Sequence, residues 1–203
     1  EVCIFFENLL LRVNRTTKIN AENFNAFRSY NYPPLATVGI HIKYEYDRIR
    51  KADPNLPMHP HYVFDTNVLI LTIFPGIQEN VVSNIFQSPG LKAVVLKTYG
   101  SGNAPQKPWF IRLLKEATQR GIIIVNISQC PAGMVEMGRY ETGLHLLDAG
   151  VISGYDATVE SVLTKLMFLL GHNLSPKEVR TEMSRSIAVS YTHLRAHETS
   201  LHL

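Results

Sequence analysis

A glycine-rich turn that directly follows an apolar strand-like run is the first candidate for chemistry. Ala93 to Thr98 is apolar and β-branched, and Tyr99-Gly100-Ser101-Gly102-Asn103 comes immediately after it. In open α/β sheets, ligands bind at the carboxyl ends of the strands, where such loops gather. We therefore expect function first at Tyr99 to Asn103. For Asn103 the structural alternative is turn formation or a helix N-cap, for which Asn is also well suited.

Two other groups of residues have types that could do chemistry. Asn14 to Lys18 is a polar, hydroxyl-rich cluster at the end of a predicted strand, although surface loops are usually polar without being sites. His59-Pro60-His61 could bind a metal, but no third ligand lies nearby in the sequence. In the last residues, His197 and His202 are five apart, whereas the zinc-protease helix needs i, i+4 spacing. We expect neither a metal nor a cofactor.

The elements that must position these residues follow an alternating strand and helix pattern from Tyr62 onward. This alternation predicts an α/β fold with a flavodoxin-like parallel sheet of about four strands and helices on both faces. Asp156 is expected to cap the fourth helix, and Ser175 with Glu178 forms a capping box for the last one. The predicted strands are 68–74, 93–98, 122–127 and 151–153. Helices are expected after Gly76, through Phe110 to Ala117, from Glu141 to Ala149, after Asp156 and after Ser175.

The rest of the chain divides by composition. Residues 2–6 and 9–13 read as strands, and Val38 to Tyr44 as an edge strand. The charged, proline-containing segment that follows reads as a linker. The residues after 188 match no packing pattern and resemble a non-native read-through. We expect the end of an N-terminal domain at 1–46, a linker at 47–61, a C-terminal α/β domain at 62–188 and a tail at 189–203.

Composition excludes several classes of protein. With 45% hydrophobic and 18% charged residues, the 203-residue chain has an ordinary globular composition. Its net charge of +3 is dispersed, which favours neither a nucleic-acid partner nor a membrane partner. Two cysteines are too few for a disulfide framework and indicate a reducing compartment, by default the cytoplasm. The chain opens at Glu1 inside a strand pattern, so we expect that its beginning is missing.

Several motifs together resemble the type I, cytoplasmic branch of the bacterial L-asparaginase family. The resemblance runs from Glu1 to about Ala188 in the order and spacing of that family. It implies that Glu1 follows the first half of a larger N-terminal α/β domain. It also implies a homo-oligomer with the site at a dimer interface. The residues that carry it are Arg12 to Lys18, Pro33-Pro34-Leu35, Tyr99 to Pro105, Asn126 to Cys130 and Ala149 to Ile152.

The resemblance assigns roles to four residues. Lys18 matches the lysine of the family's Thr-Lys-Asp cluster, so it would relieve a threonine hydroxyl of its proton, which requires a lowered pKa. Asn103 matches the asparagine that reaches the partner's substrate. Thr17 could line the site or a second, effector pocket. Lys97 stands where relatives tend to have Arg, and a lysine cannot make the same bidentate carboxylate contact, which puts effector binding in doubt.

The function implied is an amidohydrolase that converts L-asparagine to L-aspartate and ammonia through threonine nucleophiles and an oxyanion hole. The family's Thr-Gly-Gly-Thr motif is absent from this sequence. We therefore expect the chain alone to be inactive. The alternative is a non-catalytic flavodoxin-like module that binds a small ligand or nucleotide at Gly100-Ser101-Gly102, and a structural interaction domain is a third possibility. Gly-x-Gly without a third glycine is a weak phosphate-binding signal.

Overall fold

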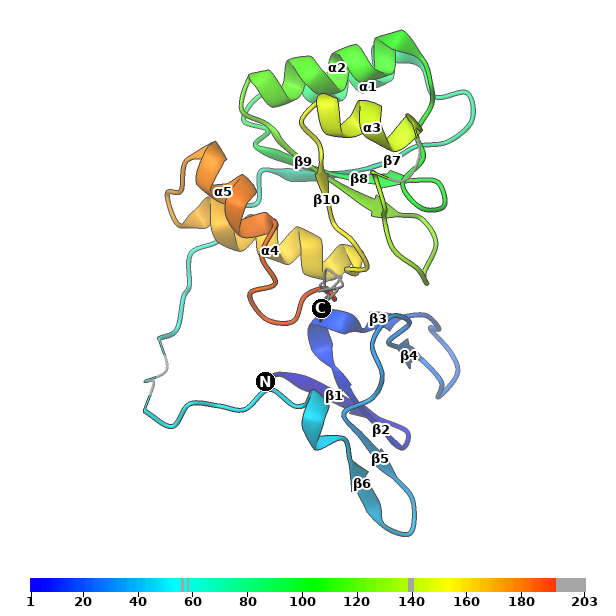
Figure 1. Cartoon of the computed structure of the whole chain (residues 1–203), viewed down its shortest axis with the longest axis vertical. Coiled ribbons are helices and arrows are strands. Elements are labelled where there is room, and N and C mark those ends of the chain that lie inside the picture. Colours follow the sequence, from blue (N-terminus) through cyan, green and yellow to red (C-terminus); the bar gives the residue numbers. More distant parts are fainter. Residues whose placement is uncertain (56, 58, 139–140, 193–203) are drawn as a thin grey trace, which may run out of the picture.

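The computed structural model describes residues 1–55, 57, 59–138 and 141–192. Its upper part in Figure 1 is a parallel four-stranded sheet with strand order β10-β9-β8-β7. The strands are β7 (Val68–Thr72), β8 (Ala93–Thr98), β9 (Ile123–Ser128) and β10 (Ile152–Ser153). The predicted strands therefore lie within one or two residues of the observed ones, and the expected parallel sheet of about four strands is confirmed.

Helices cover both faces of this sheet, as expected (Figure 1). One face packs against α1 (Glu79–Phe86), α2 (Pro108–Gln119) and α3 (Glu141–Asp148), and the other against α4 (Val159–Gly171) and α5 (Pro176–Met183). Successive residues of a strand point to opposite faces. Accordingly, Val94 and Leu96 belong to the core beneath α2, while Ala93 and Val95 belong to the core beneath α4.

Helix termini follow the local chemistry of the sequence in most cases. The capping box at Ser175 is confirmed: Glu178 N donates to Ser175 Oγ, and Glu178 Oε2 accepts from Ser175 N. Helix α2 ends at Gln119, with Arg120 as its C-cap and Gly121 as the predicted C′ residue, whose φ of 93° is left-handed and favours glycine. The prediction that Asp156 caps α4 is wrong. Thr158 is the N-cap and accepts from Ser161 N, whereas Asp156 lies two residues earlier with a different partner.

The lower part of Figure 1 is an antiparallel sheet with strand order β1-β2-β5-β6. Its strands are β1 (Cys3–Phe6), β2 (Leu9–Arg12), β5 (Ala36–Val38) and β6 (Ile42–Tyr44). The single edge strand predicted from Val38 to Tyr44 is wrong, because the chain turns at Gly39 and pairs Val38 with Ile42 as a hairpin.

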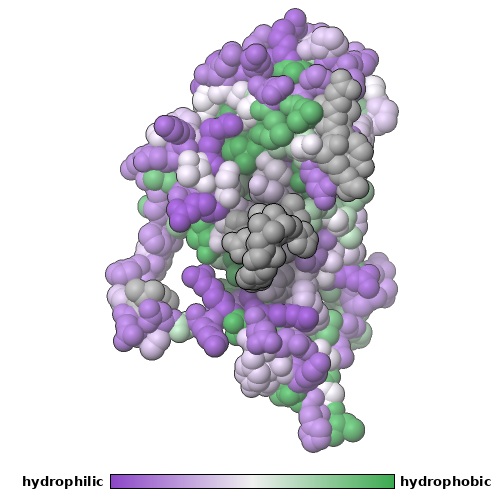
Figure 2. All heavy atoms as spheres, in the orientation of Figure 1, coloured by the Kyte–Doolittle hydropathy of each residue, from purple (hydrophilic) through white to green (hydrophobic). Residues whose placement is uncertain are grey.

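Two short pieces of structure connect this sheet to the rest of the chain. The turn η1 (Val13–Arg15) follows β2 and leads into β3 (Thr17–Lys18), which pairs with β4 (Phe27–Arg28). After η2 (Tyr46–Arg48), the chain runs along one side of the molecule to α4 and then enters β7 (Figure 1). Figure 2 shows this connecting segment standing away from the body.

Residues 189–192 pack against the C-terminal part, so the expectation that nothing after 188 packs is wrong for them. Tyr191 is buried and stacks on Tyr155, with ring centroids 4.8 Å apart. Thr192 N donates to Asp156 Oδ1 at 2.7 Å. A single aromatic contact of this kind has no periodicity that a sequence pattern could reveal. The rest of the predicted tail, residues 193–203, lies outside the described residues.

The surface in Figure 2 is mostly hydrophilic, with an apolar patch over α3. Leu144 and Leu147 are the large apolar residues of that helix that are exposed. Among the described residues, no helix combines the length and the apolar character needed to cross a bilayer.

Candidate functional site

A pocket of about 170 Å³ lies where the N-terminal strands meet the carboxyl ends of β8, β9 and β10. This is the edge of an open α/β sheet where ligands bind. Both parts of the chain line it. The N-terminal lining is Arg15, Thr17, Ile19, Tyr30 and Asn31, and the C-terminal lining is Lys97, Ile127 to Pro131, Gly133 and Tyr155 to Val159.

Two of the four predicted site residues, Thr17 and Lys97, line this pocket together. Thr17 comes from β3 and donates its hydroxyl to Glu160 Oε2 at 3.1 Å, in the first turn of α4. Lys97 shares the face of β8 that carries Ala93 and Val95, because side chains alternate along a strand. That face is covered by α4, next to the N-terminal part. The pocket therefore combines a hydroxyl and a lysine side chain from sites 80 residues apart in sequence.

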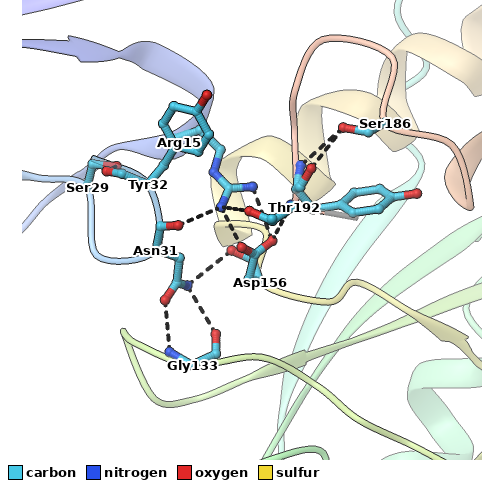
Figure 3. Close-up of polar contacts among 9 residues, drawn as sticks. Arg15, Ser29, Asn31, Tyr32, Gly133, Asp156, Ser186 and Thr192 are labelled. Atoms are coloured by element: carbon cyan, nitrogen blue, oxygen red, sulfur yellow. Dashed lines mark hydrogen bonds and ion pairs between the residues drawn. The ribbon is translucent and has the colours of Figure 1, made fainter. Parts of the chain in front are cut away.

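The wall of the pocket contains a buried ion pair that joins the two parts of the chain (Figure 3). Arg15 is 1% exposed, and its Nη1 and Nη2 donate to Asp156 Oδ1 and Oδ2 at 3.1 and 2.6 Å. Arg15 Nη2 also donates to the carbonyl of Asn31 and to the hydroxyl of Thr192. Such a bidentate pair fixes direction as well as distance. It sets the position of β3 relative to α4.

A second contact between the two parts is made by the side chain of Asn31 (Figure 3). Its Nδ2 donates to the carbonyls of Gly133 and Asp156 at 3.1 Å each, and its Oδ1 accepts from Gly133 N at 2.9 Å. The amide thus holds the loop after β9 against the N-terminal part. Sequence reasoning missed Asn31 and missed the pairing of Arg15 with Asp156. The only signal was the polar cluster Asn14 to Lys18, which contains Arg15 without indicating a partner 141 residues away.

Lys18 lies beside the pocket residues but on the other face of β3. Thr17 faces the pocket, and side chains alternate along a strand, so Lys18 points away from it. Its Nζ lies 6.0 Å from the centroid of Phe27, its partner across the β3–β4 pair, and the residue is exposed. Within the described residues, the structure therefore does not bring Lys18 together with Thr17 and Lys97.

Asn103 closes the glycine-rich loop after β8. Its N donates to Tyr99 O at 2.8 Å, and Tyr99 N donates to Asn103 O at 2.9 Å. Gly102 has a φ of 111°, and a Cβ there would lie 2.8 Å from Val135 Cγ1, so only glycine fits. The backbone of Asn103 thus forms a turn. The helix N-cap alternative is wrong, because α2 begins at Pro108 after Lys107 as its N-cap.

The buried side chain of Asn126 supports this loop from the neighbouring strand. Its Oδ1 accepts from Thr98 Oγ1 at 2.7 Å, and its Nδ2 donates to Gly102 O at 3.4 Å. Ser128 Oγ donates to Gly100 O at 2.6 Å. Because Asn126 is fully buried between helix layers, its hydrogen bonds have no competition from water. The loop that carries Asn103 is therefore held by β9.

Comparison with known proteins places this architecture in a family. Residues 67–183 match the model described as "Glutaminase/Asparaginase C-terminal domain", and residues 1–50 match "Asparaginase, N-terminal". L-asparaginase 1 of Escherichia coli strain K12 is 45% identical over 188 residues, which cover 92% of this chain and 55% of that protein. A human protein named 60 kDa lysophospholipase is 43% identical over 183 residues, which cover 90% of this chain and 32% of that protein.

The fold agrees with the sequence comparison. The crystal structure of L-asparaginase I from Vibrio cholerae superposes with a TM-score of 0.89 at 42% identity, and the match covers 95% of this chain and 58% of that one. The chain thus spans about half the length of the L-asparaginases it matches. The C-terminal family model alone covers more than half of the present sequence. With its N-terminal strands matched as well, this chain belongs to the glutaminase/asparaginase family.

Proposed function

We propose that this chain serves the hydrolysis of L-asparagine to L-aspartate and ammonia. The observation that carries the proposal is the 45% identity to L-asparaginase 1 of E. coli along 188 residues, which include the residues of both parts that line the pocket. The chain holds no Thr-Gly-Gly-Thr motif. The threonine nucleophile and its oxyanion donors would therefore come from residues outside this sequence, and the chain alone would be inactive.

Lys18 is the proposed proton acceptor for the threonine nucleophile. Its exposed position on β3, on the face away from the pocket, leaves the lysine open to a segment that packs there. Contact with such a segment would remove water from the ammonium group, and this lowers the pKa of a lysine. A positioned general base contributes about a hundred- to ten-thousand-fold to turnover.

Asn103 is the proposed substrate contact supplied by a second copy of the chain. The loop is held rigidly by Asn126 and Ser128, which suits a residue that must reach across an interface. In a two-fold dimer, the same loop serves both sites. We further propose that the pocket lined by Thr17 and Lys97 is a second, effector pocket, in which Lys97 offers one ammonium group in place of the bidentate contact of an arginine. We also propose that the protein acts in the cytoplasm, where its two free cysteines would stay reduced.

The geometry of the glycine-rich loop argues against the alternative function, nucleotide binding. Phosphate sites of that kind place a glycine-rich loop directly at a helix N-terminus, where backbone N–H groups and the helix dipole meet the anion. Here α2 begins only at Pro108, five residues after Asn103, and proline has no N–H to offer.

The test is ammonia release. The chain as it stands should release none from L-asparagine, whereas a full-length protein built by joining the amino-terminal segment of the E. coli relative to Glu1 should be active. In that protein, Lys18→Met should lower turnover about a hundred- to ten-thousand-fold. The matched control is Lys43→Met, an exposed lysine in β6. Near-normal turnover of Lys18→Met, or activity of the short chain, would contradict the assignment of Lys18.

A further inference from the structure

The His59-Pro60-His61 motif of the linker meets a histidine from a distant part of the chain. His61 Nδ1 lies 2.9 Å from Nε2 of His172, 111 residues later. His172 directly follows α4, as its C-cap. The two rings cross at 62°, with centroids 4.8 Å apart. The partner that is missing near this motif in the sequence is therefore supplied by the fold.

The tautomer of His172 is fixed by the helix. Its Nδ1 lies 2.6 Å from the carbonyl oxygen of Phe168. A carbonyl oxygen only accepts, so Nδ1 carries the hydrogen, and Nε2 of the neutral ring presents its lone pair toward His61. Metal-binding imidazoles are oriented in the same way, by donating their second nitrogen to a carbonyl or carboxylate.

We propose that His61 Nδ1 and His172 Nε2 form a two-histidine site for Cu²⁺ or Ni²⁺. Two nitrogens at neighbouring corners of a square-planar or octahedral ion, each bound at about 2.0–2.1 Å, lie about 2.9 Å apart, whereas tetrahedral zinc separates them by about 3.3–3.4 Å. The observed separation of 2.9 Å matches the first geometry. This inference is independent of the proposed hydrolysis.

The surroundings favour a cation at this point. The last carbonyl groups of α4 carry the partial negative charge of the helix C-terminus. His61 is exposed, so water can complete the coordination. The described part of the chain offers no set of three or more His, Cys, Asp or Glu side chains around one point, so the protein contributes two ligands here. On metal binding, neutral His61 moves its proton from Nδ1 to Nε2 through solvent, with no net release.

The backbone next to His61 already lies close to α4. Asp65 N donates to Met167 O at 2.9 Å, and a Cβ at Gly171 would lie 2.5 Å from Val63 O, so glycine permits the close approach of the linker. A metal ion at His61 and His172 would therefore cross-link the linker to α4 where they already touch. Since the ion binds the folded chain in preference to the unfolded one, it stabilises the fold by mass action.

The experiment titrates Cu²⁺ into the untagged chain. Calorimetry measures the affinity, and paramagnetic broadening of the histidine ring signals in NMR spectra shows which rings bind. His61→Phe and His172→Phe keep an aromatic ring but remove the ligand nitrogen. Each should weaken the site by at least about tenfold, the size of effect seen when even the supporting groups of a metal site are lost. His41→Ala, at an exposed turn, is the matched control and should change nothing.

All variants keep residues 193–203, so the three histidines there give the same background in every titration. In the parent chain, the signals of His61 and His172 should broaden at the lowest Cu²⁺ concentrations, and Ni²⁺ should raise the melting temperature. Equal affinity in both Phe variants, or broadening that spares these two rings, would show that the pair is a direct hydrogen bond only and would overturn the proposal.

Discussion

The two parts of this chain are held in shape by different interactions. In the C-terminal sheet, residues 93–96 of β8 are inaccessible to solvent, and apolar cores fill both faces. In the N-terminal part, the strand residues Phe5, Ile42 and Tyr44 are exposed, and the largest fully buried side chain is Arg15 of η1. The first part is organised by apolar burial. The second is docked on it through a buried charge, and the pocket between them depends on that docking.

This difference matters because a buried ion pair stabilises little in net terms but is costly to break. The attraction between the two charges mostly offsets their loss of hydration, whereas removing one partner leaves an uncompensated charge. An apolar core has no such asymmetry, since its stabilisation grows with the area removed from water. Substitutions in each part should therefore differ in cost: removing one charge of the ion pair should release the N-terminal part, and truncating apolar side chains should cost stability in proportion to their burial.

The largest effect is expected for Asp156→Ala. The change leaves the guanidinium of Arg15 buried without its carboxylate, so the free energy of unfolding should fall by about 3–5 kcal/mol. Urea denaturation measures it, and proteolysis of the linker should speed up because the N-terminal part is released. Asp148→Ala, on the exposed side of α3, is the control. A loss below about 1 kcal/mol would mean that other contacts dock the N-terminal part.

Ile124→Ala tests the C-terminal core. The side chain lies in β9, with no exposed surface, so its truncation should cost about 2–5 kcal/mol in the free energy of unfolding. Ile40→Ala makes the same chemical change in the N-terminal hairpin, where the side chain is 98% exposed, and should stay within about 0.5 kcal/mol. Similar losses of stability at the two positions would show that side-chain burial does not distinguish the two parts of the chain.

Ser175→Ala removes the capping box of α5, a local contribution within the C-terminal part. The expected loss is about 0.5–2 kcal/mol, because the backbone N–H of Glu178 loses its acceptor. Ser175→Gly should lower the free energy of unfolding by only a few tenths of a kcal/mol, since glycine is also tolerated at the N-cap position. Thermal unfolding of the parent chain and the two variants ranks their stabilities. A Gly variant less stable than the Ala variant would contradict the capping role of Ser175.

The last effect depends on pH and concerns Lys165 of α4. Burial lowers the pKa of its ammonium group to about 8, from the ordinary 10.5. Between pH 8 and about 10, the unfolded chain therefore holds more protons than the folded one, and the free energy of unfolding should rise with pH. Above that window the burial of Tyr191, which raises its pKa to about 12, acts in the opposite direction. Lys165→Met should flatten the rise, and an unchanged slope would exclude Lys165 as its source.

The C-terminal sheet could be predicted from the sequence because its signals are local. Apolar runs gave β8 and β9, and Ser175 and Gly121 marked helix ends through their own backbone chemistry. The β1–β2 hairpin was predicted, whereas the β5–β6 hairpin was missed because weak alternation does not distinguish one strand from two short ones. Asp156 was expected to cap a helix, since the sequence around it does not reveal an arginine 141 residues away.

The candidate site was predictable to a similar extent. The expectation that Thr17 lines a pocket came from a motif, and the structure places Thr17 and Lys97 in the lining of the same pocket. The clamp made by Asn31 and Gly133 carries no local signal, because it joins two loops 102 residues apart. The roles of Lys18 and Asn103 stay predictions. In the proposal, Lys18 serves a threonine motif that this sequence lacks, and Asn103 serves a second copy of the chain.

The linker also raises the effective concentration at which the two parts of the chain meet. Because residues near Asp65 are bound to α4, the two parts are joined through the short stretch of chain between η2 and His61. Groups joined by a short linker meet at an effective concentration in the millimolar range. Docking is therefore an intramolecular event, and the contacts of Arg15 and Asn31 need to supply less affinity to keep the pocket assembled than they would between two separate molecules.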